Sequence, residues 1–176
     1  KALEIADEKK LVFVHPFQDP KIIAGQGTLG LELIEQLPDM DCAVISVGGG
    51  GLISGVATAI KSINPKCRIV GIQAEAAPSM ARTFQSKELT VIVPSSSTLA
   101  DGVAVKTPSQ VMYDTYISKL VDEMLTVDDE EIAQAIFYLL ERSKTVVEGA
   151  GALPVAAALT GKLKGMLGKK NMFLLC

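Results

Sequence analysis

Two short apolar runs on either side of a helical stretch constrain the fold of this chain most. The runs are CAVISV (42–47) and RIVGIQAE (68–75), and both have the length of a strand. Apolar runs of this kind are typical of strands that are covered on both faces of a sheet. Because a strand, helix, strand unit makes a right-handed crossover, the two strands belong to one parallel sheet. The sequence therefore predicts an α/β fold, with a mostly parallel sheet and helices on both faces.

Further helices and strands alternate along the rest of the chain. Asp19 and Pro20 are a typical helix start, a capping side chain followed by proline, and this helix should run to about Leu37. Thr126 and Asp129 have the spacing of a capping box and predict another helix start. The remaining predicted elements are strands at LVFVH (11–15) and MFLLC (172–176), a small-residue helix (149–161) and a loop at PSSST (94–98).

Composition narrows the class of protein. The chain has 176 residues, of which 48% are hydrophobic and 21% charged, and this composition excludes disorder. A net charge of -3 gives no general attraction to nucleic acid or anionic membrane, and no apolar run reaches the roughly 18 residues of a membrane span. Cys42, Cys67 and Cys176 have the spacing of neither a zinc site nor a disulfide framework. We therefore expect a cytoplasmic protein, with Cys42 and Cys67 as buried, reduced thiols.

The two ends of the sequence lack the features of natural termini. The opening segment KALEIADEKK has helical spacing at Leu3 and Ile5, but no initiator methionine, N-cap or signal peptide. At the other end, the chain stops inside a run that should be a buried strand. We therefore expect the sequence to be a part of a longer polypeptide.

Four consecutive glycines follow the first apolar strand, in SVGGGGLISG (46–55). This position, between the carboxyl end of a parallel strand and the amino end of a helix, is where open α/β sheets bind ligands. Without Cβ atoms the backbone N–H groups can approach a bound anion, most simply a phosphate, and the helix dipole favours its charge. The order differs from G-x-G-x-x-G, and Lys61 is too distant to act as a P-loop lysine. A tight turn without a ligand is the alternative.

Five blocks of the sequence together resemble the serine/threonine dehydratases, also called threonine ammonia-lyases. The blocks are IIAGQGTLGLELIEQL (22–37), SVGGGGLISG (46–55), GIQAE (71–75), LADGVAV (99–105) and VVEGAGA (146–152). They cover essentially the whole chain, in order and at fitting intervals. The resemblance implies pyridoxal 5′-phosphate as cofactor and the large domain of the tryptophan synthase β-like fold. Serine racemase is a close relative within this group.

The resemblance assigns the glycine segment to the cofactor phosphate, which backbone N–H groups would bind. The residues that carry this role are Gly48, Gly49, Gly50, Gly51 and Leu52. Related cysteine synthases usually have threonines in this loop, so the all-glycine loop favours a dehydratase or a racemase. The resemblance also implies that the backbone of Gly102 borders the cofactor ring and that Glu148 lies near it. An ordinary acid at a helix N-terminus is the alternative for Glu148.

The resemblance leaves two alternatives open for Cys176. In the family, a Ser or Cys followed by Gly-Gly-Asn contacts the pyridine nitrogen. If the polypeptide continues with GGN, Cys176 is that residue, and if it continues with SGGN, Cys176 is its neighbour. Glu75 matches the first cation ligand of some relatives, but residues 76–84 hold no second carboxylate, so no divalent metal site is expected. A monovalent cation, potassium held by carbonyl groups, stays open.

The family's Schiff-base lysine lies in an S-F-K-x-R type motif that this chain lacks. Lys21, Lys61 and Lys119 fall on helical faces that we expect to be solvated, so they do not replace it. His15 should be satisfied by backbone groups at a strand end. We therefore expect no catalytic residue in this chain, because the lysine would precede it.

The resemblance implies a division into two domains and a reaction. Residues 1–14 would end a small domain, and residues 15–176 would belong to the large cofactor-binding domain. The implied reaction is β-elimination of water from L-threonine to 2-oxobutanoate and ammonia, by a homo-oligomer (dimer or tetramer) acting on a small amino acid. Serine racemase or a serine-specific dehydratase is the alternative, and a non-catalytic module that binds a phosphate ligand is an alternative of another class.

Overall fold

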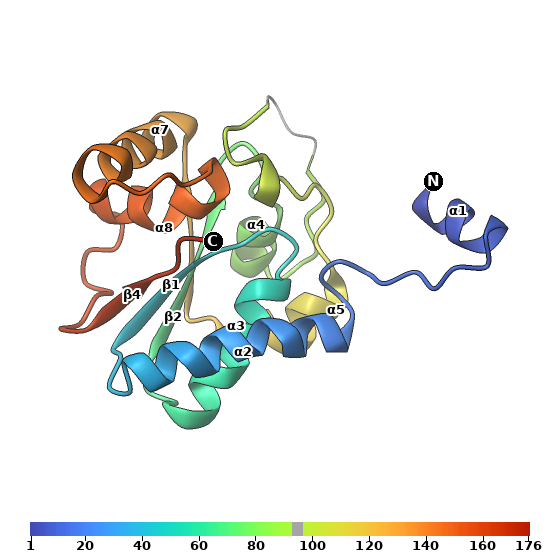
Figure 1. Cartoon of the computed structure of the whole chain (residues 1–176), viewed down its shortest axis with the longest axis horizontal. Helices are drawn as coiled ribbons and strands as arrows, with labels where there is room; N and C mark the ends of the chain where they lie inside the picture. The colour runs from blue at the N-terminus through green and yellow to red at the C-terminus, as the bar shows by residue number, and fades with distance from the viewer. Residues whose placement is uncertain (93–96) are drawn as a thin grey trace.

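A four-stranded parallel sheet with strand order β3-β2-β1-β4 forms the centre of the molecule. The computed structural model describes residues 1–92 and 97–176 (Figure 1), so the loop predicted at 94–98 lies largely outside the described residues. All three strand pairings are parallel, and the predicted α/β class with a parallel sheet is confirmed. The strands are β1 (Cys42–Ser46), β2 (Arg68–Ala74), β3 (Glu123–Val127) and β4 (Asn171–Phe173).

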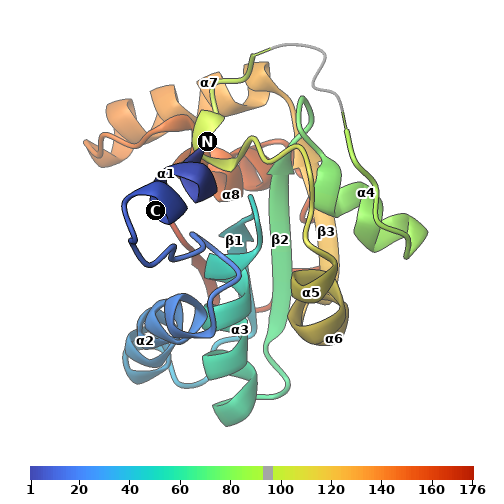
Figure 2. The ribbon, with the colours of Figure 1, turned by 90° about the vertical axis from the view of Figure 1, so that its right-hand side faces the viewer.

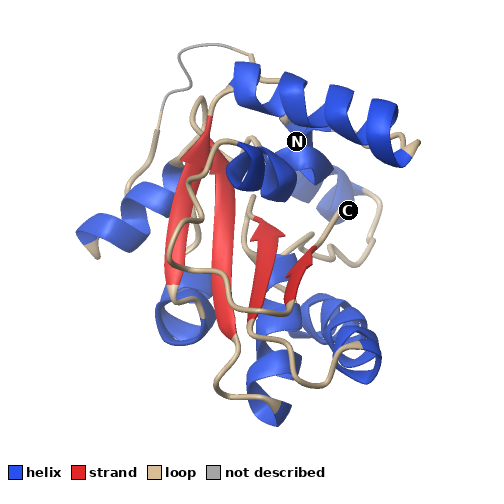
Figure 3. Ribbon diagram, turned by 90° about the vertical axis from the view of Figure 1, so that its left-hand side faces the viewer, coloured by secondary structure: helices blue, strands red, loops and turns tan. Residues whose placement is uncertain are grey.

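Helices cover both faces of this sheet, as predicted. On one face, α3 (Gly51–Ile63) and α4 (Ser79–Ser86) contact the strands, and α2 (Pro20–Gln36) packs on α3. On the other face, α8 (Gly149–Leu159) lies against the strands and α7 (Asp129–Tyr138) packs on it (Figures 2 and 3). The shorter helical segments are α1 (Ala2–Glu8), η1 (Asp101–Val103), α5 (Gln110–Met112), η2 (Tyr113–Ile117), α6 (Ser118–Leu120) and η3 (Leu139–Ser143).

The sheet separates two hydrophobic cores, because successive side chains of a strand point to opposite faces. In β1, Ala43 and Ile45 belong to the core beneath α2 and α3, whereas Cys42 and Val44 belong to the core beneath α7 and α8. All five residues of β1 are buried, which explains why the first four are apolar. The fifth, Ser46, is the one buried polar residue of the strand. Among the described residues, no helix combines the length and the apolar character that crossing a membrane would require.

One of the two predicted helix starts is correct, and the other is misplaced. Asp19 caps α2 by accepting a hydrogen bond from the Lys21 N–H at 2.8 Å, with Pro20 as first helical residue. The capping box of α7 is Asp128 with Glu131, whose side chains accept reciprocal backbone hydrogen bonds at 2.9 and 2.8 Å. Thr126 cannot cap this helix, because it lies within β3, which stays paired with β2 as far as Val127.

The predicted strand at 11–15 is wrong. This segment has no regular structure, and its four apolar side chains are exposed, Val12 to 90%. An apolar run becomes a strand only where another strand pairs with it, and within the described residues no strand lies beside it. Helix α1 before it also has no buried residue and projects from the rest of the molecule (Figure 1). At the other end, β4 covers only Asn171–Phe173 of the strand predicted for 172–176.

Candidate functional site

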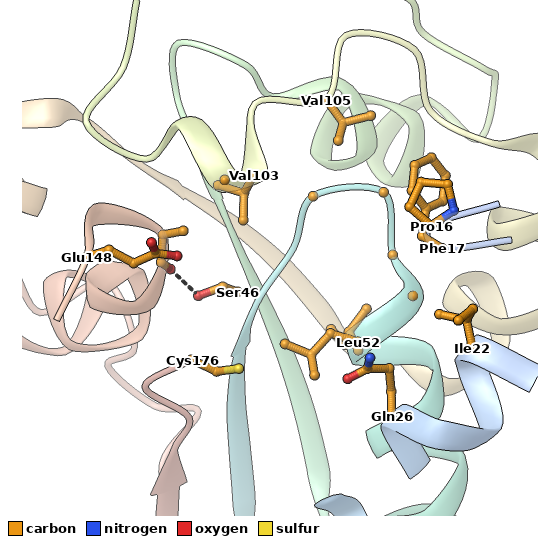
Figure 4. A pocket seen from close by; sticks show the side chains of 17 residues that line it. Pro16, Phe17, Ile22, Gln26, Ser46, Leu52, Val103, Val105, Glu148 and Cys176 are labelled. Carbon is orange, nitrogen blue, oxygen red and sulfur yellow. Dashed lines mark hydrogen bonds between the residues drawn. The ribbon is translucent and has the colours of Figure 1, made fainter. Parts of the chain in front are cut away.

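A cavity of about 340 Å³ opens at the carboxyl end of β1 (Figure 4). Segments far apart in the sequence line it, because the end of β1, the start of α3 and the start of α8 meet there. All eight residues that the resemblance assigns to cofactor binding are among those lining it: Gly48, Gly49, Gly50, Gly51, Leu52, Gly102, Glu148 and Cys176. The others are Pro16, Phe17, Ile22, Gln26, Ser46, Ile53, Val103, Val105 and Ala150.

The glycine segment forms the turn between β1 and α3. Gly50 is the N-cap of α3 and has a φ of +95°, in the left-handed region that favours glycine. The first N–H groups of a helix have no acceptor within it. Within residues 1–92 and 97–176, the N–H groups of Gly48 and Gly49 also donate to no protein acceptor. The turn therefore offers several backbone donors, together with the positive end of the α3 dipole, to a bound anion.

Phe17 explains why two of these residues lack a side chain. A Cβ atom on Gly49 would overlap the Phe17 ring, and one on Gly51 would lie 2.9 Å from the Phe17 Cβ. At Gly48, a Cβ would come within 3.1 Å of the Val103 Cα. The role of Phe17 at the cavity was not predicted from the sequence. The one signal for it is an aromatic residue just before the helix start at Asp19 and Pro20.

The wall across the cavity from the glycine turn comes from the start of α8. Glu148 is the N-cap residue of α8, but its side chain accepts no capping hydrogen bond and lies exposed at the cavity. A Cβ built on Gly102 would lie 3.5 Å from a carboxylate oxygen of Glu148. Behind them, the Ser46 hydroxyl donates a 2.6 Å hydrogen bond to the Ala150 carbonyl (Figure 4). This bond connects the end of β1 to the first turn of α8.

Cys176 lies at the cavity, whereas Cys42 lies in β1 and Cys67 directly precedes β2. Its backbone passes close to Gly151 of α8, where a Cβ would approach its N and O atoms to 3.2 Å, and its sulfur points into the cavity (Figure 4). Cys42 and Cys67 are free and fully buried, as predicted. Burial raises the pKa of each of these two thiols to about 11.

The remaining candidate residues do not line the cavity. His15 accepts hydrogen bonds at Nδ1 from the backbone N–H groups of Phe17 and Gln18, at 3.3 and 3.1 Å, so its backbone role is confirmed although the strand is not. Lys61 was expected on a solvated face, but its side chain is only 19% exposed and pairs with Asp122 at 2.8 Å. Glu75 is exposed at the end of β2. In the part of the chain that the structure describes, no three His, Cys, Asp or Glu residues gather as metal ligands.

Comparison with known proteins gives a family match over the whole chain. The model of the family described as "Pyridoxal-phosphate dependent enzyme" matches residues 1–176. An L-threonine ammonia-lyase of Thermotoga maritima is 52% identical over 158 residues, 90% of this chain and 39% of that protein. The L-threonine dehydratase catabolic TdcB of Escherichia coli K12 is 47% identical over 163 residues, 93% of this chain and 49% of that protein. The chain thus spans less than half the length of these two curated relatives.

Solved structures agree with this match. The crystal structure of a threonine deaminase from T.th. superposes with a TM-score of 0.90 at 35% identity, covering 98% of this chain and 64% of that one. Maize serine racemase superposes with a TM-score of 0.89, also at 35% identity, covering 97% of this chain and 52% of that one.

Proposed function

Since this chain belongs to the family of pyridoxal-phosphate dependent enzymes, we propose that it forms the cofactor-binding part of a threonine ammonia-lyase. The observation that carries the proposal is the cavity at the end of β1, where all eight residues expected from the sequence come together. The relatives that are 45–52% identical are named as L-threonine ammonia-lyases or dehydratases. The proposed substrate is therefore L-threonine, and the proposed products are 2-oxobutanoate and ammonia.

The residues around the cavity fit pyridoxal phosphate. The backbone N–H groups of Gly48 to Leu52 and the N-terminus of α3 suit a phosphate group, because both carry partial positive charge. Four of these five residues are glycines, so no side chain keeps the phosphate away from the backbone. When bound, the cofactor supplies an electron sink that stabilises negative charge at the Cα of an amino acid. Gly102 and Glu148 would lie beside its ring, with the Glu148 carboxylate as a hydrogen-bond acceptor. Cys176 would lie at or next to the pyridine nitrogen.

The Schiff-base lysine is proposed to come from outside this chain. Among the described residues that line the cavity, none is a lysine. The chain also spans less than half the length of the two curated relatives described above, so the lysine has room in the part of such a protein that this chain does not cover. We assign residues 15–176 to the large domain. Residues 1–14 are proposed to end the small domain, a proposal supported by the exposed apolar side chains at 11–14.

Several finer features of the whole protein are proposed on the same basis. The protein is proposed to be a cytoplasmic homo-oligomer, and an apolar groove of about 320 Å³ between α2 and α3 supports a buried partner surface. A monovalent cation near Glu75 is proposed from the resemblance alone. A dependence of activity on potassium, with sodium as the matched control, would support the cation, and equal rates in both salts would exclude it.

Expression of the full-length protein that contains this chain tests the proposed function. The expected result is cofactor absorbance that co-purifies with the protein, together with 2-oxobutanoate produced from L-threonine. Formation of D-serine from L-serine would instead support a serine racemase, an alternative that the superposition on maize serine racemase favours. Pyruvate from L-serine without turnover of threonine would indicate a serine-specific dehydratase. Protein that binds a phosphate ligand but turns over no amino acid would overturn the enzyme proposal in favour of a binding module.

A further inference from the structure

A proline lies in the interior of α8, where it interrupts the hydrogen bonding of the helix. Pro154 is the sixth residue of this helix, which runs over Gly149–Leu159. In an α-helix the N–H of a residue donates to the carbonyl four residues earlier, and for position 154 that carbonyl belongs to Ala150. Proline has no N–H. Ala150 is only 5% exposed, so the carbonyl needs a donor from within the protein.

Ser46, the last residue of β1, supplies this donor. Its hydroxyl donates to the Ala150 carbonyl at 2.6 Å, from a position 104 residues earlier in the sequence. Ser46 is itself 5% exposed, so both partners are shielded from water. A side-chain hydroxyl at the end of β1 thus replaces the backbone hydrogen bond that Pro154 removes from α8.

We propose that Ser46 is a positioning residue of the cofactor site, which fixes the first turn of α8 against the end of β1 by completing the hydrogen bonding that Pro154 leaves open. The link to the cofactor rests on the proposed function, whereas the pairing of Ser46 with Pro154 does not. Two residues after Ser46, the glycine turn begins at Gly48. Two residues before Ala150 lies Glu148, at the opposite wall.

The geometry gives Ser46 an indirect role. Its proton is directed to the Ala150 carbonyl and is therefore not free to serve a ligand. What the bond controls is the separation between the glycine turn and Glu148, the two groups proposed to hold the phosphate and to border the ring. Loss of the bond should loosen this separation and weaken cofactor binding even in protein that stays folded.

A double-mutant cycle in the full-length protein tests the proposal. The variants are Ser46→Ala, Pro154→Ala and both together, and the readouts are the Kd for pyridoxal phosphate and the unfolding midpoint of the cofactor-free protein. We expect Ser46→Ala to raise the Kd about tenfold, because a buried carbonyl loses its donor. Pro154→Ala alone should change the Kd less than about threefold, since Ser46 remains in place. In the double variant, both the Kd and the unfolding midpoint should return toward the wild-type values, because the new N–H at position 154 reaches the Ala150 carbonyl.

Thr83→Ala is the matched control. Thr83 is fully buried, and its hydroxyl donates to the backbone carbonyl of Ser79 at 2.8 Å and accepts from the Thr90 N–H at 3.0 Å. It does not line the cavity. We expect this variant to lower the unfolding midpoint without changing the Kd for the cofactor. If Thr83→Ala weakens cofactor binding as much as Ser46→Ala does, the positioning role is overturned.

The two readouts separate this inference from the proposed function. If the wild-type protein binds no pyridoxal phosphate, the proposed function fails, and the unfolding midpoints still test the pairing. Independent, additive effects of Ser46→Ala and Pro154→Ala on the midpoint would overturn the pairing. If Ser46→Ala alone does not fold, a folded double variant supports it. If neither Ser46→Ala nor the double variant folds, while Pro154→Ala does, the pairing of Ser46 with Pro154 is overturned.

Discussion

At the scale of single residues, the four consecutive glycines are required for different reasons. Gly50 needs its left-handed φ of +95°, whereas Gly49 and Gly51 leave room for Phe17 and Gly48 leaves room for Val103. Only the first of these is a requirement of the backbone itself, and the others depend on a neighbour. A Cβ at Gly50 would also come within 2.8 Å of the Ile117 side chain, but not near Phe17. A change at Phe17 should therefore alter the cost of a substitution at Gly49 but not at Gly50.

Gly49→Ala should destabilise the protein by about 2 kcal/mol, because the new methyl group overlaps the Phe17 ring. In a Phe17→Ala background the same substitution should cost much less, since the ring is gone. Urea unfolding of the four proteins measures both effects. Gly25→Ala is the control, because a Cβ at Gly25 meets no atom within 4 Å and alanine favours the helix. Equal costs of Gly49→Ala in both backgrounds would contradict the role of Phe17.

The buried thiols of Cys42 and Cys67 should resist modification in the native protein. Burial raises their pKa from 9.0 to about 11, so the reactive thiolate is scarce at pH 8. Because the folded state holds these protons more tightly than the unfolded one, their contribution to stability is complete below pH 9 and declines as the pH rises toward 11. Reaction with a disulfide reagent, in a Cys176→Ser variant, should be slow until urea unfolds the chain. Rapid labelling without urea would contradict the burial.

At the scale of elements, the start of α7 shows how strand pairing selects a cap. Thr126 and Asp129 satisfy the sequence pattern, yet Asp128 and Glu131 form the box, because Ala74 pairs with Val127 and holds Thr126 in β3. Asp129 instead accepts hydrogen bonds from the Thr98 hydroxyl at 2.6 Å and the Leu99 N–H at 3.1 Å. The side chain that was expected to belong to the cap therefore holds the neighbouring loop.

Removal of the true cap should be measurable. Asp128→Ala should lower the free energy of unfolding by about 1 kcal/mol, because the Glu131 N–H loses its acceptor. Thr126→Val, which keeps a β-branched side chain in the strand, should cost clearly less. Urea unfolding compares the two variants. A larger loss for Thr126→Val than for Asp128→Ala would restore the capping box that the sequence predicted.

At the scale of the whole molecule, the first residues are separate from both hydrophobic cores. Helix α1 buries no side chain, and residues 11–14 are exposed. Phe17 is the first residue from the N-terminus that packs against the core beneath α2 and α3. The compact part of this chain therefore begins close to residue 15, where the proposed large domain begins.

Deletion of residues 1–10 from this chain should change its thermal unfolding midpoint by less than about 2 °C, because no buried contact is lost. Deletion of residues 1–17 is the comparison, since it also removes Phe17, which lies over the glycine turn. We expect this second truncation to lower the midpoint clearly. A large loss from the first deletion would show that the N-terminal segment packs on the compact part of the chain.

The sequence by itself determined the parallel sheet, the helices on both of its faces and the position of the glycine turn. These features depend on local patterns, because the apolar run at 42–47 is followed directly by the glycines and then by the helix that they begin. Eight of the residues at the cavity could be named from the resemblance. Seven of them belong to short blocks such as SVGGGGLISG (46–55) or VVEGAGA (146–152), and Cys176 ends the last apolar run.

Only the tertiary structure decided which side chains meet. The apolar run at 11–15 has the pattern of a strand but, among the described residues, no strand beside it, and the cap of α7 depended on the pairing of β3 with β2. Phe17 over the glycines, and Ser46 with the carbonyl that Pro154 leaves open, are contacts between distant segments. Local patterns indicated the type and approximate place of most elements, but a hydrogen bond across 104 residues exists only after the sheet has brought its two partners together.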